Sequence, residues 1–416
     1  MSDKLKSIRG MHDGLPHDVA GWRHIEEAAR TICSRYGFRE IRLPILEPTP
    51  LFIRSIGSET DIVDKEMYTF EDKGGDWLSL RPEGTAGAVR AYLQAGLTRS
   101  GIQRWFYMGP MFRRERPQKG RLRQFQQIGV ELFGDAGPVC DAEILAMAHD
   151  LLERIGIRDV RLELNSLGCP ACRPAYREEL LAFLHRQHDH LCDTCRTRID
   201  RNPMRVLDCK EPGCQAVLGD APEMLSHLCD ECDAHFHGLK ENLDRLAVPY
   251  HINPRIVRGL DYYTRTAFEI VTTQLGAQGT VIAGGRYDGL VEELGGPTTP
   301  AIGFALGLER LALLLPDADP ETPDVALVAL GEEAQAQAVR TAHTMRAAGL
   351  ATVLCGSGSA KSQFKRADRE QARFVVVIGE DELARDELTL KDMRDGTQQS
   401  VSLDQAVRAC REAASG

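Results

Sequence analysis

The chain has 416 residues, which at about 150 residues per domain predicts two or three domains with ample core. Its net charge of −10 disfavours a general DNA-coating protein, although a local basic surface could still bind another nucleic acid. Hydrophobic residues make up 43% and charged residues 27%, and these ordinary values exclude a collagen-like or largely disordered chain.

The amino-terminal part of the chain predicts helices packed on strands. Apolar residues at helical spacing predict a helix over residues 18–36 that ends at Gly37, and a strand over residues 38–44 follows. Further helices are expected over residues 83–94 and 141–155. The other apolar runs that predict strands are 67–70, 77–80, 104–108, 126–133, 160–164, 266–272 and 280–283. Because strands and helices do not alternate strictly, we expect an α+β domain with a largely antiparallel sheet over residues 1–320.

A segment of different composition interrupts this domain. Residues 168–238 hold eight of the 12 cysteines together with many His, Asp and Pro, and strand patterns resume beyond them. We interpret residues 166–245 as a Cys-rich, helical insertion. In a long chain without an apolar leader, such cysteines favour metal ligands or free thiols over a disulfide framework.

Proline and acidic residues at 316–323 predict a linker to a second domain, residues 324–416. Strands expected at 325–330, 351–354 and 374–378 and helices expected at 332–348 and 403–413 indicate an α/β fold there. The longest apolar run, 301–315, is too short and interrupted to span a membrane, and the first ten residues show no signal segment. We therefore expect a cytoplasmic protein with neither a membrane nor DNA as partner.

Common nucleotide-binding sequences are absent: the chain has no P-loop, no Gly-rich dinucleotide motif and no H-E-x-x-H zinc helix. Arginines offer another way to hold phosphate. Residues 112–125 predict a hairpin whose basic loop could bind an anion, with Phe125 stacking on a base. Residues 303–310 predict a strand that runs into a helix near Arg310. A solvated basic turn, a core phenylalanine and a surface arginine are the competing interpretations.

Several of these segments together resemble a known family. Residues 37–44, residues 112–115 with the following loop, and residues 303–310 resemble, in this order, motifs 1, 2 and 3 of class II aminoacyl-tRNA synthetases. The segments that resemble signatures of the histidyl-tRNA synthetase family are RGLDYYTRT at 258–266, AGGRYDG at 283–289, RPEGTAG at 81–87 and QIGVE at 127–131. From residue 8 into the second domain, the chain resembles bacterial members of this family.

The resemblance implies a two-step reaction. The carboxylate of L-histidine attacks the α-phosphate of ATP, which gives histidyl-adenylate and pyrophosphate, and the 3′-terminal ribose of tRNA(His) then accepts the histidyl group. It also implies Mg²⁺ on the polyphosphate, a homodimer formed through motif 1, and an anticodon-binding second domain. The alternative is a catalytically inactive regulatory subunit of a histidine-biosynthetic phosphoribosyltransferase. Such subunits lack the second domain and lose signature residues, whereas this chain has the second domain and keeps the signature residues.

The resemblance assigns roles to single residues as well. Arg113 and Arg258 are expected on the α-phosphate, where two cations would stabilise the charge that develops in the transition state. Arg121 and Arg310 fit the γ-phosphate, and Phe125 with Arg310 fits the two faces of adenine.

Histidine would be bound by a mainly polar set of side chains. The expected residues are Glu83, Thr85 and Gln127 at the amino group, Glu131 and Tyr263 at the imidazole, and Tyr262 and Tyr287 in the wall of the site. Structural salt bridges are the competing role for the two glutamates. A site built to hydrogen-bond a polar side chain rejects analogues without it, so we expect no editing domain.

Contacts to tRNA are expected at two basic places. Arg116 and Gln118 in the motif 2 loop fit the acceptor end. Lys361, Lys365 and Arg366 form a basic cluster in the second domain that fits the anticodon, and a solvated helix face explains this cluster equally well.

The cysteines of the insertion form four close pairs. These pairs are Cys169 with Cys172, Cys192 with Cys195, Cys209 with Cys214, and Cys229 with Cys232. The first two pairs read C-x₂-C-x₁₉-C-x₂-C, the spacing of a zinc site, and the last two give a looser second set, C-x₄-C-x₁₄-C-x₂-C. Reduced thiols, a site that has lost its metal, and disulfides compete. Because the insertion has few large apolar residues for a core of its own, the zinc would be structural.

Overall fold

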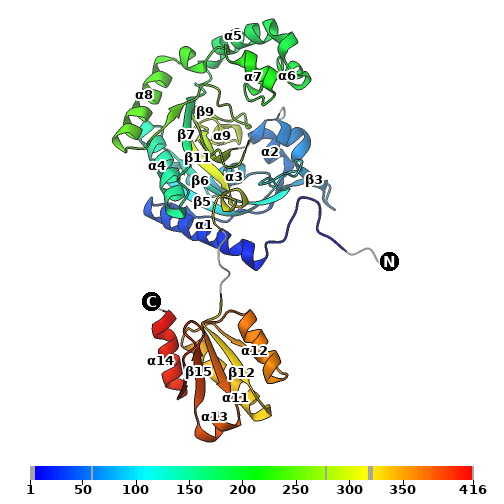
Figure 1. Ribbon diagram of the computed structural model, residues 1–416. Helices are drawn as coiled ribbons and strands as arrows, with labels where there is room; N and C mark the ends of the chain where they lie inside the picture. Colours follow the sequence, from blue (N-terminus) through cyan, green and yellow to red (C-terminus); the bar gives the residue numbers. More distant parts are fainter. Residues whose placement is uncertain (1–4, 58–59, 277–278, 317–321, 415–416) are drawn as a thin grey trace. The chain divides into compact units, whose positions relative to one another are not determined.

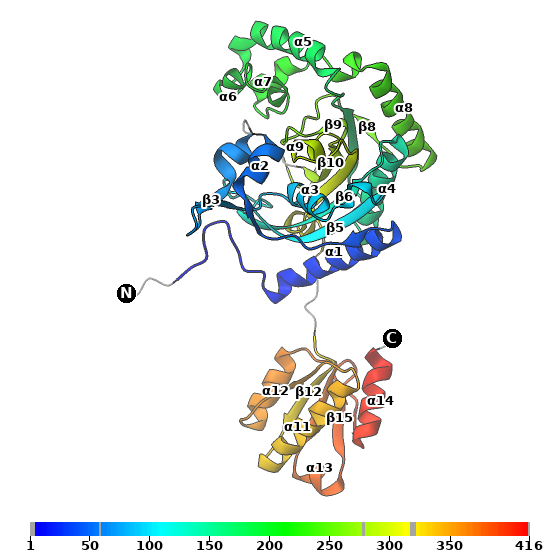
Figure 2. The same cartoon turned by 180° about the vertical axis from the view of Figure 1, so that it is seen from behind.

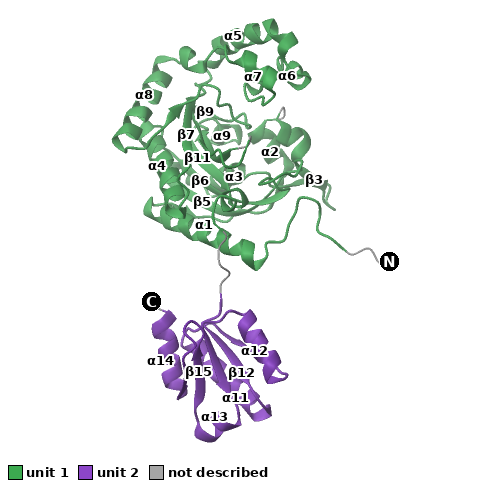
Figure 3. Ribbon diagram, in the orientation of Figure 1, with its two compact units in different colours: residues 1–318 green, residues 319–416 purple. Residues whose placement is uncertain are grey.

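The computed structural model describes residues 5–57, 60–276, 279–316 and 322–414. The chain divides into two compact units, Met1–Ala318 and Asp319–Gly416 (Figure 3). Most of the predicted linker, residues 316–323, lies outside the described residues. Within the described part of the chain, no helix has the length and apolar character that a membrane crossing requires.

An eight-stranded sheet forms the centre of the first unit (Figures 1 and 2). Its order is β1-β5-β6-β11-β10-β9-β7-β8, and its six central strands pair antiparallel, whereas the edge strands β1 and β8 pair in parallel. The strands are β1 (Arg39–Glu40), β5 (Gln103–Phe112), β6 (Gln124–Phe133), β7 (Arg161–Ser166), β8 (His251–Ile252), β9 (Thr264–Val271), β10 (Thr280–Arg286) and β11 (Ala301–Gly307). The predicted α+β fold with a largely antiparallel sheet is confirmed.

The two faces of the sheet have different tasks. Along β6, Ile128, Val130 and Leu132 join the main apolar core with α1 (Pro16–Arg35) and α4 (Pro138–Ile155). The alternate positions, among them Gln127 and Glu131, point to the opposite face, which α3 (Thr85–Gln94) covers in part. The side-chain period of two therefore separates a hydrophobic face from a functional face.

The strand predicted over residues 38–44 is wrong. Only Arg39 and Glu40 pair with β5. The carbonyl oxygens of Leu43 and Pro44 instead accept hydrogen bonds from the guanidinium of Arg81 at 2.8 and 3.2 Å, so they are not available to a neighbouring strand. The chain then enters a separate three-stranded sheet, whose strands lie in the order β2 (Leu46–Pro48), β4 (Trp77–Leu80) and β3 (Tyr68–Glu71). Helix α2 (Thr49–Ile56) follows β2 in the chain.

Between β7 and β8 the chain forms a helical insertion. Its helices are α5 (Arg173–Arg186), α6 (Asp193–Arg198), α7 (Pro212–Leu218) and α8 (Asp230–Arg245). The expectation that it builds little core is wrong, because Tyr176, Leu180, Leu184, Val206 and Leu218 are buried together with four of its cysteines. These apolar residues are spread over short helices and turns, so no single run stands out in the sequence.

The second unit has a five-stranded sheet in the order β13-β12-β14-β15-β16. Its strands are β12 (Val325–Ala329), β13 (Thr352–Leu354), β14 (Phe374–Ile378), β15 (Leu388–Asp392) and β16 (Gln398–Val401). One face packs on α11 (Glu332–Ala347) and α14 (Leu403–Ala414), and the other on α12 (Ala360–Arg369). The predicted elements are present, but β15, β16, α12 and α13 (Glu380–Arg385) are additions, and β15 and β16 pair antiparallel.

Candidate active site

Glu131 lies at the centre of a buried hydrogen-bond cluster on the functional face. Its carboxylate accepts hydrogen bonds from the hydroxyls of Thr85 at 2.8 Å, Tyr107 at 3.0 Å and Tyr287. The residue is 1% exposed, and burial raises the pKa of its carboxyl to about 8 although the three hydroxyls act in the opposite direction. Among the expected histidine-binding residues, the structure thus brings Glu131, Thr85 and Tyr287 together.

Glu83 has a different environment. Helix α3 was expected to begin at Glu83 but begins at Thr85, because the Glu83 carboxylate accepts hydrogen bonds from the amides of Thr85 at 2.5 Å and Ala86 at 2.9 Å. These two amides are among the donors that a helix leaves unpaired at its first turn. Glu83 therefore caps the helix, while burial raises the pKa of its carboxyl.

Two buried polar atoms near these residues have no hydrogen-bond partner in the described part of the chain. One is the side-chain oxygen of Gln127, and the other is Nε of Arg258. Buried polar groups are nearly always paired, so an unpaired acceptor at Gln127 and an unpaired donor at Arg258 fit contacts with a polar ligand.

Arg258 is held in place from two sides. Its Nη1 donates a hydrogen bond to Glu269 at 2.7 Å, and its guanidinium lies 5.1 Å from the ring centre of Tyr263. Tyr263 in turn contacts Tyr262 at 4.7 Å between ring centres, and Tyr262 meets the edge of Tyr287 at 5.7 Å. The three tyrosines form one continuous buried wall between Arg258 and Glu131.

The residues expected to bind ATP line a second hollow. An open cavity of about 160 Å³ is bordered by Arg113, Arg121, Phe125 and Arg310, and Gln127 lies in the same lining. The guanidinium of Arg113 lies 5.5 Å from the ring centre of Phe125. All four nucleotide residues therefore share one cavity, which Gln127, an expected histidine-binding residue, also borders.

Three carboxylates of this region were missed by the sequence reasoning. Glu115 pairs with Arg121 at 3.0 Å and lies 3.9 Å from Arg113, and Glu269 holds Arg258. Glu309 borders the cavity, and burial raises the pKa of its carboxyl to about 7, while the backbone amide of Gln126 donates to it at 2.8 Å. Each of the three lies within or next to a motif segment, so a carboxylate at that position was a candidate site residue from the sequence alone.

Tyr107 was also missed. Its ring lies opposite Gly129 in the β5–β6 pairing, and a Cβ at Gly129 or at Gly84 would come within 2.1 Å of the ring. Two glycines thus make the room that lets Tyr107 reach Glu131. The signal was present in the sequence as glycines inside strand and helix-start patterns.

The expected tRNA residues lie outside these cavities. Arg116 and Gln118 are exposed in the loop between β5 and β6. In the second unit, Lys361 and Lys365 are exposed one turn apart on α12. Arg366 is exposed too, but its guanidinium donates to the carbonyls at residues 355 and 357 at 2.7 and 3.1 Å, which gives it a structural task.

The cysteines of the insertion meet in two clusters, but the expected pairing is wrong. The first pair meets the fourth, so that one cluster consists of Cys169, Cys172, Cys229 and Cys232. The second pair meets the third, so that the other consists of Cys192, Cys195, Cys209 and Cys214. The spacing along the chain suggested that consecutive pairs combine. In the fold, the first and fourth pairs combine instead, and the second and third pairs lie in the loop between them.

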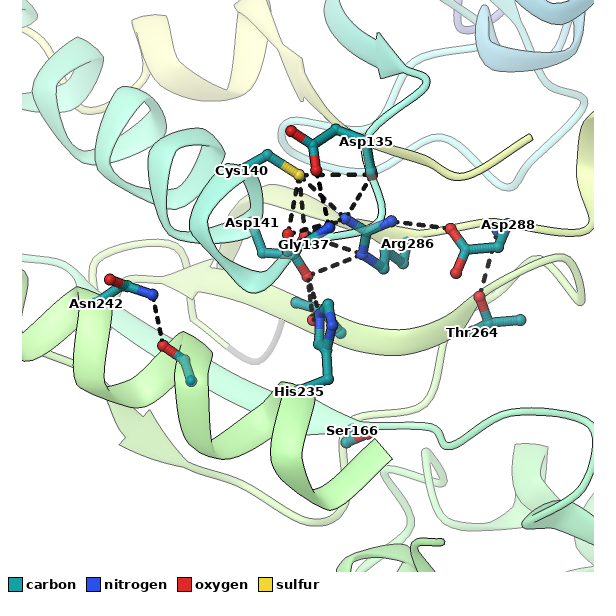
Figure 4. Close-up of polar contacts among 12 residues, drawn as sticks. Asp135, Gly137, Cys140, Asp141, Ser166, His235, Asn242, Thr264, Arg286 and Asp288 are labelled. Carbon is teal, nitrogen blue, oxygen red and sulfur yellow. Dashed lines mark hydrogen bonds and ion pairs between the residues drawn. The ribbon is translucent and has the colours of Figure 1, made fainter. Parts of the chain in front are cut away.

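A buried ion-pair network ties the insertion to the signature AGGRYDG segment (Figure 4). Asp141 on α4 accepts hydrogen bonds from Arg286 at 2.6 Å, His235 of α8 at 2.8 Å and Thr266 at 2.5 Å. Asp141 and Arg286 are both 0% exposed. Burial raises the pKa of Asp141, but the opposing effect of His235 and Arg286 is larger, so the pKa of Asp141 lies below its ordinary value.

Replacing Arg286 by alanine should destabilise the protein by about 3–5 kcal/mol, because Asp141 would remain buried without its main cation. Urea unfolding monitored by tryptophan fluorescence measures this loss. The double variant Arg286→Met/Asp141→Leu should recover part of it, since the uncompensated charge of Asp141 is removed, while His235 and Thr266 lose their acceptor. A loss below about 1 kcal/mol for Arg286→Ala would show that the pair contributes no such stabilisation.

The three motif segments are neighbours in space. Motif 1 contains the edge strand β1, motif 2 is the β5–β6 hairpin, and motif 3 is β11 followed by α10 (Leu308–Ala312). The strands β1, β5, β6 and β11 lie side by side in the sheet, and motifs 2 and 3 border the arginine-lined cavity. This arrangement defines the class II aminoacyl-tRNA synthetase fold.

Comparison with known proteins gives the family. A family model described as Histidyl-tRNA synthetase matches residues 10–311, and one described as Anticodon binding domain matches residues 324–413. The histidine–tRNA ligase of Trichlorobacter lovleyi is 52% identical to this chain, over 97% of this chain and 97% of its own length. The histidine–tRNA ligase of Aromatoleum aromaticum is also 52% identical, over 99% of this chain and 96% of its own length. The apo structure of Staphylococcus aureus histidyl-tRNA synthetase matches with a TM-score of 0.81 at 36% identity, over 98% of this chain and 100% of that chain.

The chain belongs to the histidyl-tRNA synthetase family. Its activity is accordingly that of an ATP-dependent aminoacyl-tRNA ligase specific for histidine. The regulatory-subunit alternative is not favoured, because the relatives that match nearly the full length are histidine–tRNA ligases.

Proposed function

We propose that the chain activates L-histidine at the cluster around Glu131 and transfers it to tRNA(His). The observation that supports this most is the Glu131 carboxylate, which is buried among three hydroxyls on the strand that also carries the unpaired amide oxygen of Gln127. Charging of tRNA(His) with labelled histidine tests the proposal. Failure of this charging by the purified protein with ATP and Mg²⁺ would refute it.

Histidine would bind between the two polar ends of the cluster. Glu131 and Tyr263 bind the imidazole, while Gln127 accepts a hydrogen bond from the α-ammonium group. Thr85 and Glu83 complete the amino-group side, Glu83 by shaping the start of α3 and adding negative charge. Tyr262 and Tyr287 exclude water, which strengthens each of these hydrogen bonds.

The reacting carboxylate would then face the nucleotide cavity. Arg113 and Arg258 approach the α-phosphate from two sides, and both guanidiniums are already fixed by contacts with aromatic rings. Arg121 and Arg310 bind the terminal phosphates, and Phe125 stacks on adenine. Charges that are fixed before the reaction begins stabilise the transition state without further reorganisation.

Class II synthetases generally use Mg²⁺ with ATP. Mg²⁺ prefers carboxylate oxygens and phosphates and keeps several waters. Glu309 fits this preference, since its carboxylate borders the cavity and is held by a backbone amide rather than by a cation. When bound there with ATP, the ion would neutralise charge on the polyphosphate.

The tRNA would contact both units. Arg116 and Gln118 are exposed at the motif 2 loop and fit the acceptor end. In the second unit, Lys361 and Lys365 flank Phe364, whose ring is 42% exposed, so that α12 offers two cations and a stacking surface for unpaired bases. Arg366 supports the end of β13 from the same helix. We assign residues 1–320, with the insertion at 166–245, to catalysis and 324–416 to the anticodon.

Reversing both charges, as in Lys361→Glu/Lys365→Glu, should raise KM for tRNA(His) about tenfold. The plot of the logarithm of the tRNA binding constant against the logarithm of the salt concentration should become less steep, by about 1.5–2 in its slope. ATP–pyrophosphate exchange should not change. Arg408→Glu on α14, which packs on the other face of the sheet, is the matched control. Equal effects of the double variant and the control on tRNA charging would remove α12 from the tRNA contact.

A homodimer in the cytoplasm is the assembly that we propose, since the motif 1 segment forms the dimer interface in the family that this chain resembles. Large apolar side chains are exposed in the segments that follow motif 1 in the chain. These residues are Ile45, Leu46, Ile53, Phe70 and Trp77.

We also propose that the cysteines of the insertion hold structural zinc. Elemental analysis of protein purified without chelator should find about two zinc ions per chain, one for each four-cysteine cluster. Less than one zinc per chain, with all eight thiols open to titration in the folded protein, would contradict this.

A further inference from the structure

The two cysteine clusters differ in their place in the insertion. We call Cys169, Cys172, Cys229 and Cys232 the neck cluster, because its first pair precedes α5 and its second pair opens α8. The tip cluster, Cys192, Cys195, Cys209 and Cys214, lies on the short helices between them. The neck cluster joins residues 57 positions apart and therefore closes the part of the insertion between α5 and the start of α8.

The geometry of both clusters fits a tetrahedral metal ion. Four sulfurs at about 2.3 Å from a zinc ion lie about 3.8 Å apart. The Sγ atoms of Cys169 lie 3.6 Å from Cys172 and 3.9 Å from Cys229, and those of Cys192 and Cys209 lie 3.9 Å apart. These separations are far too long for disulfides, and all eight thiols are free.

Each cluster also has a backbone amide that donates to one of its sulfurs. The amide of Cys229 lies 3.1 Å from Sγ of Cys172 in the neck, and the amide of Cys192 lies 3.1 Å from Sγ of Cys214 in the tip. Such second contacts orient a thiolate toward a metal and stabilise its charge.

The neck cluster lies directly against the loop that carries Arg258 and Tyr263. Arg173, the residue after Cys172, donates through Nη2 to the backbone carbonyl of Tyr263 and through Nε to the carbonyl of Leu167 at 3.3 Å. On the other side, the amide of Arg265 donates to the carbonyl of Gly168 at 2.8 Å, one residue before Cys169. Both ends of the turn between Cys169 and Cys172 are therefore bonded to the start of β9.

A cavity of about 250 Å³ lies beside these contacts and is lined by both the insertion and this loop. Arg173, Arg258 and Tyr263 all line it. With space on that side, the loop is supported by the hydrogen bonds from the neck rather than by close packing alone. A change in the neck would thus reach Arg258 and Tyr263 directly.

We infer that the neck cluster is a zinc site that positions the histidine-binding loop, and that Arg173 is the positioning residue that transmits its geometry. The inference rests on the proposed function, because it concerns the same site. Zinc fixes the turn from Cys169 to Cys172, the turn fixes Arg173, and Arg173 fixes the carbonyl of Tyr263. The tip zinc stabilises only its own short helices.

Two pairs of variants test this inference. Cys232→Ser in the neck and Cys195→Ser in the tip remove equally buried ligands, and each should lower the zinc content from about two ions to about one. Arg173→Ala and Arg177→Ala lie one turn apart on α5 and should both keep about two zinc ions. Arg177 donates to the carbonyl of Asp200 and not to the loop.

Cys232→Ser and Arg173→Ala should each raise KM for histidine about tenfold in ATP–pyrophosphate exchange, with KM for ATP changed less than twofold. Both should speed deuterium uptake of residues 258–265. Cys195→Ser and Arg177→Ala should change neither quantity. Because Arg173→Ala keeps all eight ligands, it tests the contact even where a cysteine variant folds poorly.

Unchanged histidine KM and deuterium uptake in Arg173→Ala would overturn the inference, as would equal effects of the neck and tip variants. Zinc content and deuterium uptake do not require activity. A wild-type protein without exchange activity would therefore refute the proposed function, while these two readouts would still decide the role of the neck.

Discussion

Arg258→Ala should slow histidyl-adenylate formation by about 100-fold or more, the size of effect seen when one preorganised donor to a developing charge is removed. The affinities for histidine and ATP should change much less. The reason lies in the structure, where Arg258 is already fixed by Glu269 and by the ring of Tyr263 and has one unpaired donor left at Nε.

Single-turnover formation of the adenylate separates this rate from binding. Arg255→Ala, three residues earlier in the same segment, is the control and should behave like the wild type. Equal losses of rate and of ground-state affinity in Arg258→Ala would mean that the arginine binds substrate and transition state alike, which contradicts the role assigned to it.

Glu131→Gln should lower kcat/KM for histidine by at least about 100-fold, because the imidazole loses a buried carboxylate partner. The same variant should be more stable than the wild type in alkaline solution. The pKa of Glu131 is about 8 in the folded protein, against an ordinary value of 4.5. Between these two values the unfolded chain is ionised at this position and the folded protein is not.

The wild type therefore takes up a proton at Glu131 on folding, and this contribution to stability is complete below pH 4.5 and lost as the pH rises through about 8. Glutamine cannot ionise, so the melting temperature of the variant should fall less than that of the wild type over this range, and the part due to Glu309, whose pKa is raised to about 7, should be the same in both. Melting temperatures at pH 6 and pH 9 check this directly. A variant that loses as much stability as the wild type between these pH values would show that Glu131 does not carry the dependence.

Most of the sheet could be predicted from the sequence, since its central strands have clear apolar alternation. The strand expected at 38–44 failed because its carbonyls are bonded by Arg81, a residue about 40 positions away. Helix α3 began two residues late for a similar reason, because the Glu83 side chain replaces the first turn of hydrogen bonds. Side-chain bonds to the backbone, whether from a distant residue or from a neighbouring one, leave no periodic trace in a sequence.

The candidate site shows the same division. The resemblance pointed to residues that do gather around Glu131 and around the arginine-lined cavity, but it did not point to Tyr107, Glu115, Glu269 or Glu309. The pairing of the cysteines failed because spacing alone cannot distinguish neighbouring pairs from nested pairs. Only the return of the chain along α8 brings Cys229 and Cys232 to Cys169 and Cys172.

ATP–pyrophosphate exchange with each of the 20 amino acids in turn tests the central claim most directly, because it measures adenylate formation without tRNA. The site built around Glu131, Gln127 and Arg258 predicts exchange with histidine and background rates with the other 19. Exchange of similar efficiency with a second amino acid, or none with histidine, would contradict it.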